Sequence, residues 1–256
     1  MNFLVSNNEI KLVRSLAQKK YRDLHGLFVV EGEKMVAEAR RSGFIMDKMY
    51  LQDEVGEAAM ARLSMMSSPS PALAVLKKPS DSVIEDVREY ELPGKGLFLV
   101  LDGVRDPGNL GTILRIADWF GIDAVFASGD TVDIFNPKVV QASMGAIFRV
   151  KFHYCEIARL CRFVSLSGGD AYGTFLDGDN IYSKKLNIGD ATKSLIVIGN
   201  ESNGISPAVA SAISSRLFIP PYPEDERGSE SLNAAVATAV TVAEFRRRAH
   251  SNNPAL

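Results

Sequence analysis

The chain has 256 residues, of which 46% are apolar and 23% are charged, and its formal net charge is −2. These values are typical of a globular protein of one or two domains, and they argue against a protein that coats nucleic acid indiscriminately. No apolar run approaches the roughly 18 residues of a membrane span, and the first 20 residues lack the apolar core of a secretory signal, so we expect a cytoplasmic protein without membrane contact.

The first part of the chain reads as a small α/β domain. A basic helix that ends near Gly26 is followed by a short buried strand at 27–32, a helix at 33–41 and a strand at 45–51. Residues 89–96 then place a proline and two glycines ahead of a stronger apolar run. This composition is typical of a linker, so we place a domain boundary after residue 92.

The basic helix allows two interpretations. Residues 11–22 contain no acidic residue and five basic ones, which are Lys11, Arg14, Lys19, Lys20 and Arg22. Such a run is either an ordinary solvated helix face or a contact with nucleic-acid phosphates.

From residue 93 onward, strands and helices alternate regularly. The apolar run at 96–101 is typical of a strand that is buried on both faces of a parallel sheet. Further strands are expected at 122–128, 149–154, 171–176, 194–199 and 216–220, and helices at 109–121, 136–148, 156–166, 206–214 and 231–248. This alternation predicts an α/β domain with a mostly parallel sheet, whose ligands bind at the carboxyl ends of the strands.

The first polar turn at a strand end, 101–121, contains glycines but does not match a phosphate-binding loop. Asn109 and Leu110 follow Gly108, where such a loop has lysine and serine or threonine, so an ATP- or NAD-using enzyme is disfavoured. The turn instead offers Asn109 at the helix start and Arg115 six residues further on. Arg115 is either a contact for an anion or hydroxyl, or a surface arginine that covers its own helix.

Two more strand ends carry polar turns. The second turn, "GNESNG" at 199–204, has Glu201 at its centre. A carboxylate disfavours phosphate and suits a cation or a hydroxyl, although the turn also reads as a simple helix cap. The third segment, 217–240, leads from a strand into a helix of small residues that begins at Ser231. Such a helix either packs very closely against another backbone or is an ordinary buried helix.

Taken together, the three motifs resemble those of the SpoU/TrmH family of S-adenosylmethionine-dependent RNA 2′-O-ribose methyltransferases. "LDGVRDPGN" with an arginine six residues after its asparagine, "GNESNG", and "IP" followed by "SLNAAVATA" occur in the family's order within 97–245. An ordered three-part match is more specific than any single glycine pattern. In addition, "FVVEGEKMVAEA" resembles the small substrate-binding domain of many members.

The resemblance implies the fold and the cofactor. The expected fold is a small α/β RNA-binding domain at 1–92, followed at 93–256 by a SPOUT-type methyltransferase domain with a mostly parallel sheet and a deep trefoil knot. S-adenosylmethionine would lie in the knot, and the residues expected to contact it are Gly199, Asn200, Ile219, Ser231 and Leu232. The acidic loop at 221–230 is longer than the family's usual loop.

The resemblance also implies which residues face the ribose and the methyl group, namely Asn109, Arg115, Glu201 and Asn233. A ribose 2′-hydroxyl is barely acidic, and a guanidinium is effectively never deprotonated. We therefore expect Arg115 to stabilise developing alkoxide charge and to anchor a phosphate. The base stays open between water, a phosphate oxygen and Glu201.

No metal is expected, because the donor is a sulfonium and because Cys155, Cys161 and the three histidines lack the spacing of a metal site. Reduced thiols are the expected state of both cysteines.

The expected partners are ribosomal or transfer RNA and a second copy of the chain. Lys19, Lys20 and Arg22 are the expected phosphate contacts, and DNA is not an expected partner. The small-residue face of the last helix and the family's habit both favour a homodimer through the α/β domain. The alternative function is a non-catalytic RNA-binding or ribosome-assembly factor that retains the fold, against which the joint presence of the motif residues argues.

Overall fold

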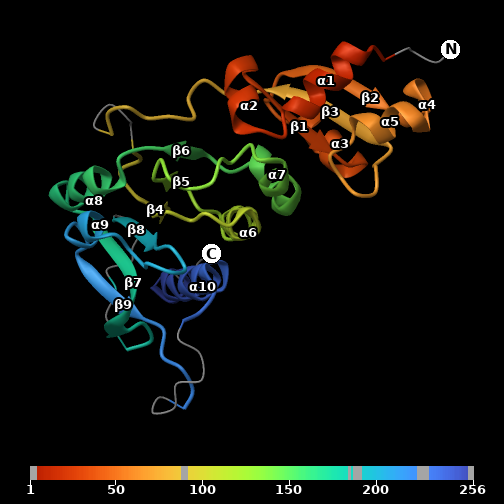
Figure 1. Cartoon of the computed structure of the whole chain (residues 1–256). Coiled ribbons are helices and arrows are strands. Elements are labelled where there is room, and N and C mark those ends of the chain that lie inside the picture. Colours follow the sequence, from red (N-terminus) through yellow and green to blue (C-terminus); the bar gives the residue numbers. More distant parts are fainter. Residues whose placement is uncertain (1–4, 88–91, 184–185, 187–191, 224–230, 253–256) are drawn as a thin grey trace. The chain divides into compact units, whose positions relative to one another are not determined.

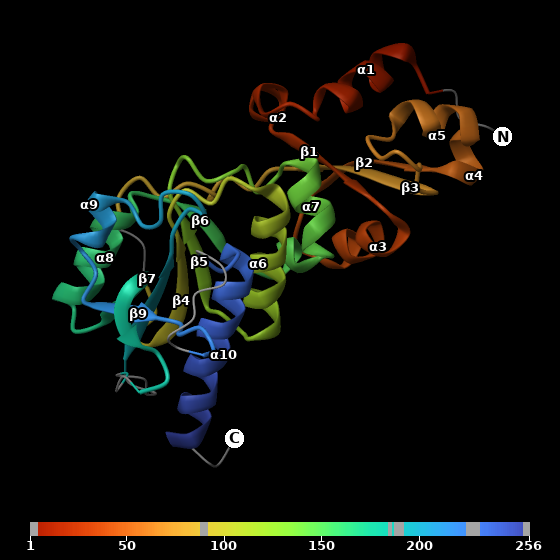
Figure 2. The same cartoon turned by 60° about the horizontal axis from the view of Figure 1, so that its bottom comes forward.

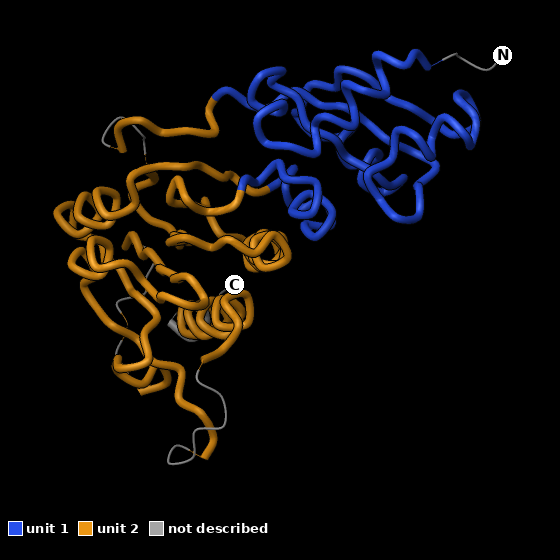
Figure 3. The backbone as a smooth tube through the Cα atoms, in the orientation of Figure 1, with its two compact units in different colours: residues 1–80, 133–149 blue, residues 81–132, 150–256 orange. Residues whose placement is uncertain are grey.

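The computed structural model describes residues 5–87, 92–183, 186, 192–223 and 231–252 (Figure 1). The chain forms two compact units, one of residues 1–80 and 133–149 and the other of residues 81–132 and 150–256 (Figure 3). The segment 133–149 thus belongs to the first unit, although it lies inside the predicted range 93–256. The predicted boundary after residue 92 follows directly on residues 88–91, which lie outside the described part, and it stays a prediction.

The first unit is built on an antiparallel sheet with strand order β1-β3-β2. Its strands are β1 (Leu27–Glu31), β2 (Met46–Leu51) and β3 (Ala72–Lys77). The sequence pattern alone did not indicate β3, because Pro69 and Pro71 interrupt it. Both prolines precede the strand, where their missing N–H groups disturb no ladder hydrogen bond.

Two helices of the first unit differ from the sequence-based expectation. The helices of this unit are α1 (Asn7–Ser15), α2 (Lys19–His25), α3 (Glu33–Arg41), α4 (Gln52–Val55), α5 (Glu57–Leu63), α7 (Pro137–Ser143) and the 3₁₀ turn η1 (Ala146–Phe148). The basic helix is therefore two helices, α1 and α2. The expected helix at 136–148 ends early because Met144 and Gly145 adopt φ values of 50° and 92°.

Side chains from both faces of this sheet are buried. On one face Val29 and Val75 pack with Val13 of α1 and Met60 of α5. Phe28, which points to the opposite face, lies 4.7 Å from Phe135 between ring centroids. Residues 133–149 therefore complete the core of the first unit.

The second unit is built on a six-stranded sheet with strand order β6-β5-β4-β8-β7-β9. The strands are β4 (Gly96–Leu101), β5 (Ala124–Ala127), β6 (Phe152–Tyr154), β7 (Asp170–Asn180), β8 (Lys193–Ile198) and β9 (Ser215–Phe218). Each neighbouring pair among these strands is parallel, which confirms the predicted α/β sheet. The trefoil knot stays a prediction.

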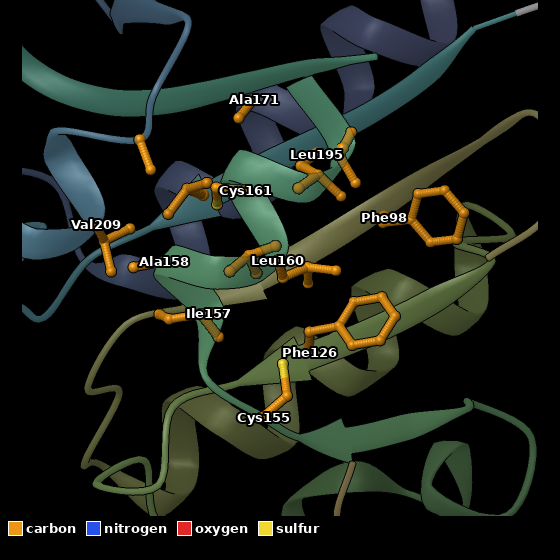
Figure 4. Close-up of a cluster of buried hydrophobic side chains, with 14 of the residues drawn as sticks. Phe98, Phe126, Cys155, Ile157, Ala158, Leu160, Cys161, Ala171, Leu195 and Val209 are labelled. Atoms are coloured by element: carbon orange, nitrogen blue, oxygen red, sulfur yellow. The ribbon is translucent and has the colours of Figure 1, made fainter. Parts of the chain in front are cut away.

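Helices cover both faces of the six-stranded sheet (Figure 2). They are α6 (Pro107–Trp119), α8 (Ile157–Leu166), α9 (Pro207–Ala210) and α10 (Ala234–Asn252). Phe98 of β4 and Phe126 of β5 contribute to a buried cluster with Leu160 of α8 (Figure 4), whereas α6 and α10 pack together on the other face. The central strands β4 and β8 end side by side, so the turns that follow them lie at one edge of the sheet.

Candidate active site

The structure joins the three polar motifs through one asparagine. Asn109, in the first turn of α6, donates from its Nδ2 to Oε1 of Glu201 at 2.5 Å. Asn233, just before α10, donates from its Nδ2 to Oδ1 of Asn109 at 2.9 Å. Glu201 and Asn233, which lie 92 and 124 positions after Asn109 in the sequence, thus form one chain of hydrogen bonds with it at the carboxyl ends of β4 and β8.

The turns after β4 and β8 are fastened to each other by two further hydrogen bonds. The buried carboxylate of Asp102 accepts the backbone N–H of Ser206 at 2.7 Å. Asn200 donates from its Nδ2 to the carbonyl oxygen of Gly103 at 2.7 Å. Asn200 also shapes its own turn, because its Oδ1 accepts the N–H groups of Ser202 and Asn203. The position of Glu201 relative to Asn109 is therefore fixed from both sides.

Gly199 is required by close packing inside the second turn. A Cβ atom at this position would lie 2.3 Å from the carbonyl carbon of Gly204 and 2.4 Å from the N atom of Ile205. Asn200 and Gly204 also exchange two backbone hydrogen bonds across the turn. Any larger residue than glycine would open the turn that carries Glu201.

An open pocket of about 650 Å³ lies over this junction. The residues that line it are Arg105, Asp106, Asn109, Asn200, Glu201, Ser202, Asn203 and Asn233. All of these residues have polar side chains, among them two carboxylates and one guanidinium. Such a lining offers hydrogen bonds to sugar hydroxyls and suits a positively charged sulfonium.

The residues expected to bind the cofactor are only partly brought together. Gly199 and Asn200 lie in the second turn, and Asn200 lines the pocket. Ile219 follows β9 and is half-buried, whereas Ser231 and Leu232 precede α10 and are exposed. Residues 224–230, the main part of the acidic loop between these positions, lie outside the described residues.

Arg115 does not line the pocket that contains the other expected catalytic residues. Six residues on an α-helix correspond to about 9 Å of rise and about 120° of rotation away from Asn109. The side chain is exposed on α6, and no hydrogen bond or ion pair holds its guanidinium among the described residues. Within one chain, Arg115 and Asn109 therefore point in different directions.

The expectation that Arg22 contacts RNA is wrong, because Arg22 is buried with 1% of its surface exposed. Its Nε and Nη2 atoms donate to Oδ2 of Asp133 at 2.9 and 2.7 Å. Nη1 donates to the carbonyl oxygens of Leu16 and Ala17. The whole guanidinium is thus used inside the first unit.

Lys19 and Lys20 are exposed, as a phosphate contact requires. Lys19 pairs with Asp23 at 2.6 Å in an exposed ion pair, and the Nζ atom of Lys20 lies 5.7 Å from the ring centroid of Tyr21. Their role as RNA contacts stays a prediction.

Sequence reasoning missed Arg105 and Asp102, although both lie within the first motif. Arg105 directly precedes the helix cap Asp106 and lines the pocket. Asp102 directly follows β4 and holds the second turn. Their positions at the end of a predicted central strand were the available signal.

The two cysteines are buried and free, in line with the expectation of reduced thiols. Burial raises the pKa of both thiols to about 12, so they remain protonated and unreactive at neutral pH. Among the residues that the structure describes, no cluster of three or more potential metal ligands occurs. The described helices include none that is long and apolar enough to cross a bilayer.

Comparison with known proteins gives matches over nearly the whole chain. The model of the SpoU rRNA methylase family matches residues 96–243, and that of the MRM3-like substrate binding domain matches residues 7–84. The chain is 29% identical to the 23S rRNA (guanosine(2553)-2′-O)-methyltransferase RlmP of Bacillus subtilis, over 94% of this chain and 96% of the relative.

Two solved structures are similar over the full length. A protein of Porphyromonas gingivalis described as an RNA methyltransferase of the TrmH family is 37% identical, with a TM-score of 0.83 and coverage of 96% of this chain and 100% of that one. An AdoMet-bound rRNA methyltransferase of Sinorhizobium meliloti is 26% identical, with a TM-score of 0.84 and coverage of 97% and 98%.

Proposed function

The chain belongs to the SpoU rRNA methylase family, and on that premise we propose that it methylates a ribose 2′-hydroxyl of ribosomal RNA with S-adenosylmethionine. The observation that carries the proposal is the junction of Asn109, Glu201 and Asn233 over one pocket. These side chains come from all three family motifs. A non-catalytic assembly factor is not favoured, because such a factor does not require this junction.

The pocket residues suit the two reactants. When bound, the cofactor supplies an electrophilic methyl group on a sulfonium, and the carboxylates of Glu201 and Asp106 favour a positive charge nearby. Asn109 and Asn233 carry both donors and acceptors, which suits the orientation of ribose hydroxyls. Holding the 2′-hydroxyl in line with the methyl group supplies much of the acceleration in such a transfer. The proton leaves to water, to a phosphate oxygen or to Glu201.

Loss of the gene is expected to remove one ribose methylation from ribosomal RNA. The measurement is mass mapping of 2′-O-methyl groups in ribosomal and transfer RNA from cells with and without the gene. The first nucleotide to inspect is the one equivalent to the guanosine for which the Bacillus subtilis relative is named. Identical maps from both strains would contradict the proposed function, and a change confined to transfer RNA would reassign the substrate.

The proposal extends to a homodimer formed through α6 and α10. Three residues on one stripe of α6, Thr112, Arg115 and Trp119, are exposed, and Trp119 is 85% exposed. Val236 on the neighbouring α10 is 48% exposed, and small residues follow it along that helix. An exposed tryptophan on a helix that packs against a helix of small residues is typical of an interface. A second copy on this surface would bring its own Arg115 toward the pocket from outside.

Light scattering on the purified chain at micromolar concentration is expected to give twice the monomer mass of 27.9 kDa. Trp119→Arg places a charge in the proposed interface and is expected to shift the population to monomer. Leu166→Arg is the matched control, because Leu166 is 88% exposed on α8, away from α6 and α10. A monomeric and fully active wild-type protein would contradict the dimer.

We also propose that Lys19 and Lys20 contact RNA phosphates, which the match of residues 7–84 to a substrate-binding domain supports. The double variant Lys19→Ala, Lys20→Ala is expected to weaken RNA binding. It should flatten the plot of log affinity against log salt by up to about two units, since each phosphate contact contributes about 0.7–0.9. A control is Lys95→Ala with Lys151→Ala, two exposed lysines of the second unit. Equal slopes for wild type and the Lys19–Lys20 variant would show that these lysines are only solvated.

A further inference from the structure

The pocket contains one positively charged side chain to which the three sequence motifs give no role. Its charge is opposite to that of the carboxylates in the same lining. Arg105 is the only basic residue among the described residues that line the pocket. Its neighbours in the lining include two carboxylates, Asp106 and Glu201. A guanidinium beside a site for sugar hydroxyls is suited to bind an anion that arrives with the sugar.

Arg105 is held in place by a chain of contacts from the end of β5. Its Nη2 atom lies 3.1 Å from Oδ2 of Asp130. The other oxygen of Asp130 accepts the hydroxyl of Ser128 at 2.6 Å, and Ser128 in turn accepts the N–H of Gly103 at 2.9 Å. The guanidinium is therefore anchored to the turns after both β4 and β5.

Because residue 103 is a glycine, the carboxylate of Asp130 can lie against the turn that follows β4. Its φ is +69°, and a Cβ atom there would lie 3.1 Å from Oδ2 of Asp130. The hydrogen bond from Ser128, with further help from Arg105, holds the pKa of Asp130 below its ordinary value. Asp130 is therefore a permanent anion at neutral pH.

The ion pair between Arg105 and Asp130 is weak enough to be exchanged. The side chains are 66% and 55% exposed, and only one contact joins them. Exposed pairs of this kind contribute little to stability. A phosphodiester, which offers two oxygens to the planar guanidinium, is a stronger partner.

Resting on the proposed function, we propose that Arg105 binds the RNA phosphodiester adjacent to the methylated ribose. Asp130 holds the guanidinium over the pocket in the free enzyme and is replaced by the phosphate when RNA binds. Arg105 is thus a substrate-binding residue that places the 2′-hydroxyl beside Asn109 and Glu201. The cofactor's carboxylate is the competing anion, and the test separates the two.

The experiment measures methyl transfer by the full chain to ribosomal RNA extracted from cells that lack the gene. Arg105→Ala is expected to raise KM for RNA by about tenfold, the effect of losing one charged hydrogen-bonded contact. Its kcat and its affinity for S-adenosylhomocysteine are expected to stay within about twofold of wild type. Arg105→Lys should recover only part of the RNA affinity, because lysine lacks the planar fork. Asp130→Asn should not raise KM, since the asparagine amide oxygen can still accept the hydrogen bond from Arg105 while the competing negative charge is removed.

Arg162→Ala is the matched control, because Arg162 pairs with Glu156 on α8 at 4.0 Å with both side chains similarly exposed. An unchanged KM in Arg105→Ala overturns the proposal. A loss of S-adenosylhomocysteine affinity also overturns it and assigns Arg105 to the cofactor. A rise of KM in Asp130→Asn equal to that of Arg105→Ala overturns it as well, because the pair then acts as a structural bridge.

Failure of the proposed function gives a different result. In that case wild type itself transfers no methyl group to this RNA. Binding of the same RNA at several salt concentrations then decides the role of Arg105. A salt slope lower by about one unit in Arg105→Ala supports the phosphate contact, and an equal slope overturns it.

Discussion

Replacement of Arg115 by alanine is expected to reduce kcat of methyl transfer by two decades or more, and to leave S-adenosylhomocysteine binding intact. A guanidinium that meets developing alkoxide charge contributes on the order of 3 kcal/mol to transition-state stabilisation, which corresponds to about two decades in rate. The side chain is exposed and makes no described hydrogen bond, so the melting temperature should hardly change. Single-turnover kinetics with saturating RNA measures the chemical step directly.

A mixing experiment decides whether Arg115 acts on its own pocket or on that of a second copy. Arg115→Ala and Glu201→Gln are each expected to be nearly inactive. If the arginine comes from the partner, mixed dimers contain one pocket with both groups intact, and activity rises well above that of either variant. If the arginine acts within its own chain, each pocket lacks one group and the mixture stays inactive. Near-normal turnover by Arg115→Ala alone would instead move the catalytic role to another residue.

Replacement of Arg22 by alanine is expected to lower the free energy of unfolding by about 3–5 kcal/mol, because Asp133 would remain buried without its partner. Asp133 is 9% exposed, and its Oδ1 atom accepts the backbone N–H of Phe135 at 3.1 Å. Urea denaturation followed by circular dichroism measures the effect. Asp133→Ala should cost a similar amount, since it strands the guanidinium instead.

A double variant with apolar replacements at both positions separates the loss of packing from the loss of the ion pair. If the ion pair is the cause, the double variant Arg22→Met, Asp133→Leu should be more stable than either alanine variant. Lys19→Ala is the matched control, because it removes the exposed pair with Asp23 and should change stability by less than about 1 kcal/mol. A loss below about 1 kcal/mol for Arg22→Ala would contradict the buried ion pair.

One part of the site, the contact between Asn109 and Glu201, could be predicted from the sequence because both residues follow central strands of the sheet. Asn109 and Glu201 follow two apolar runs that become the adjacent strands β4 and β8, so their contact follows from a parallel sheet. The direction of Arg115 could not be predicted in the same way. Helix periodicity separates it from Asn109 by about 120°, but which of the two faces meets the pocket depends on packing.

The role of Arg22 was beyond local sequence reasoning for a different reason. A run of basic residues in 11–22 looks uniform, and yet it forms two helices with different environments. Arg22 finds its partner 111 residues further along the chain. No charge pattern within a dozen residues can indicate that one arginine of the run is buried and that Lys19 and Lys20 are exposed.

The partnership of Arg22 with Asp133 limits how this chain can be cut or recombined. The first unit is discontinuous in sequence, because residues 133–149 return to it after β5 has been completed. A chimera that exchanges only the first 80 residues with a relative would separate Arg22 from Asp133 and Phe28 from Phe135. Any successful exchange of the first unit between family members must therefore carry both segments together.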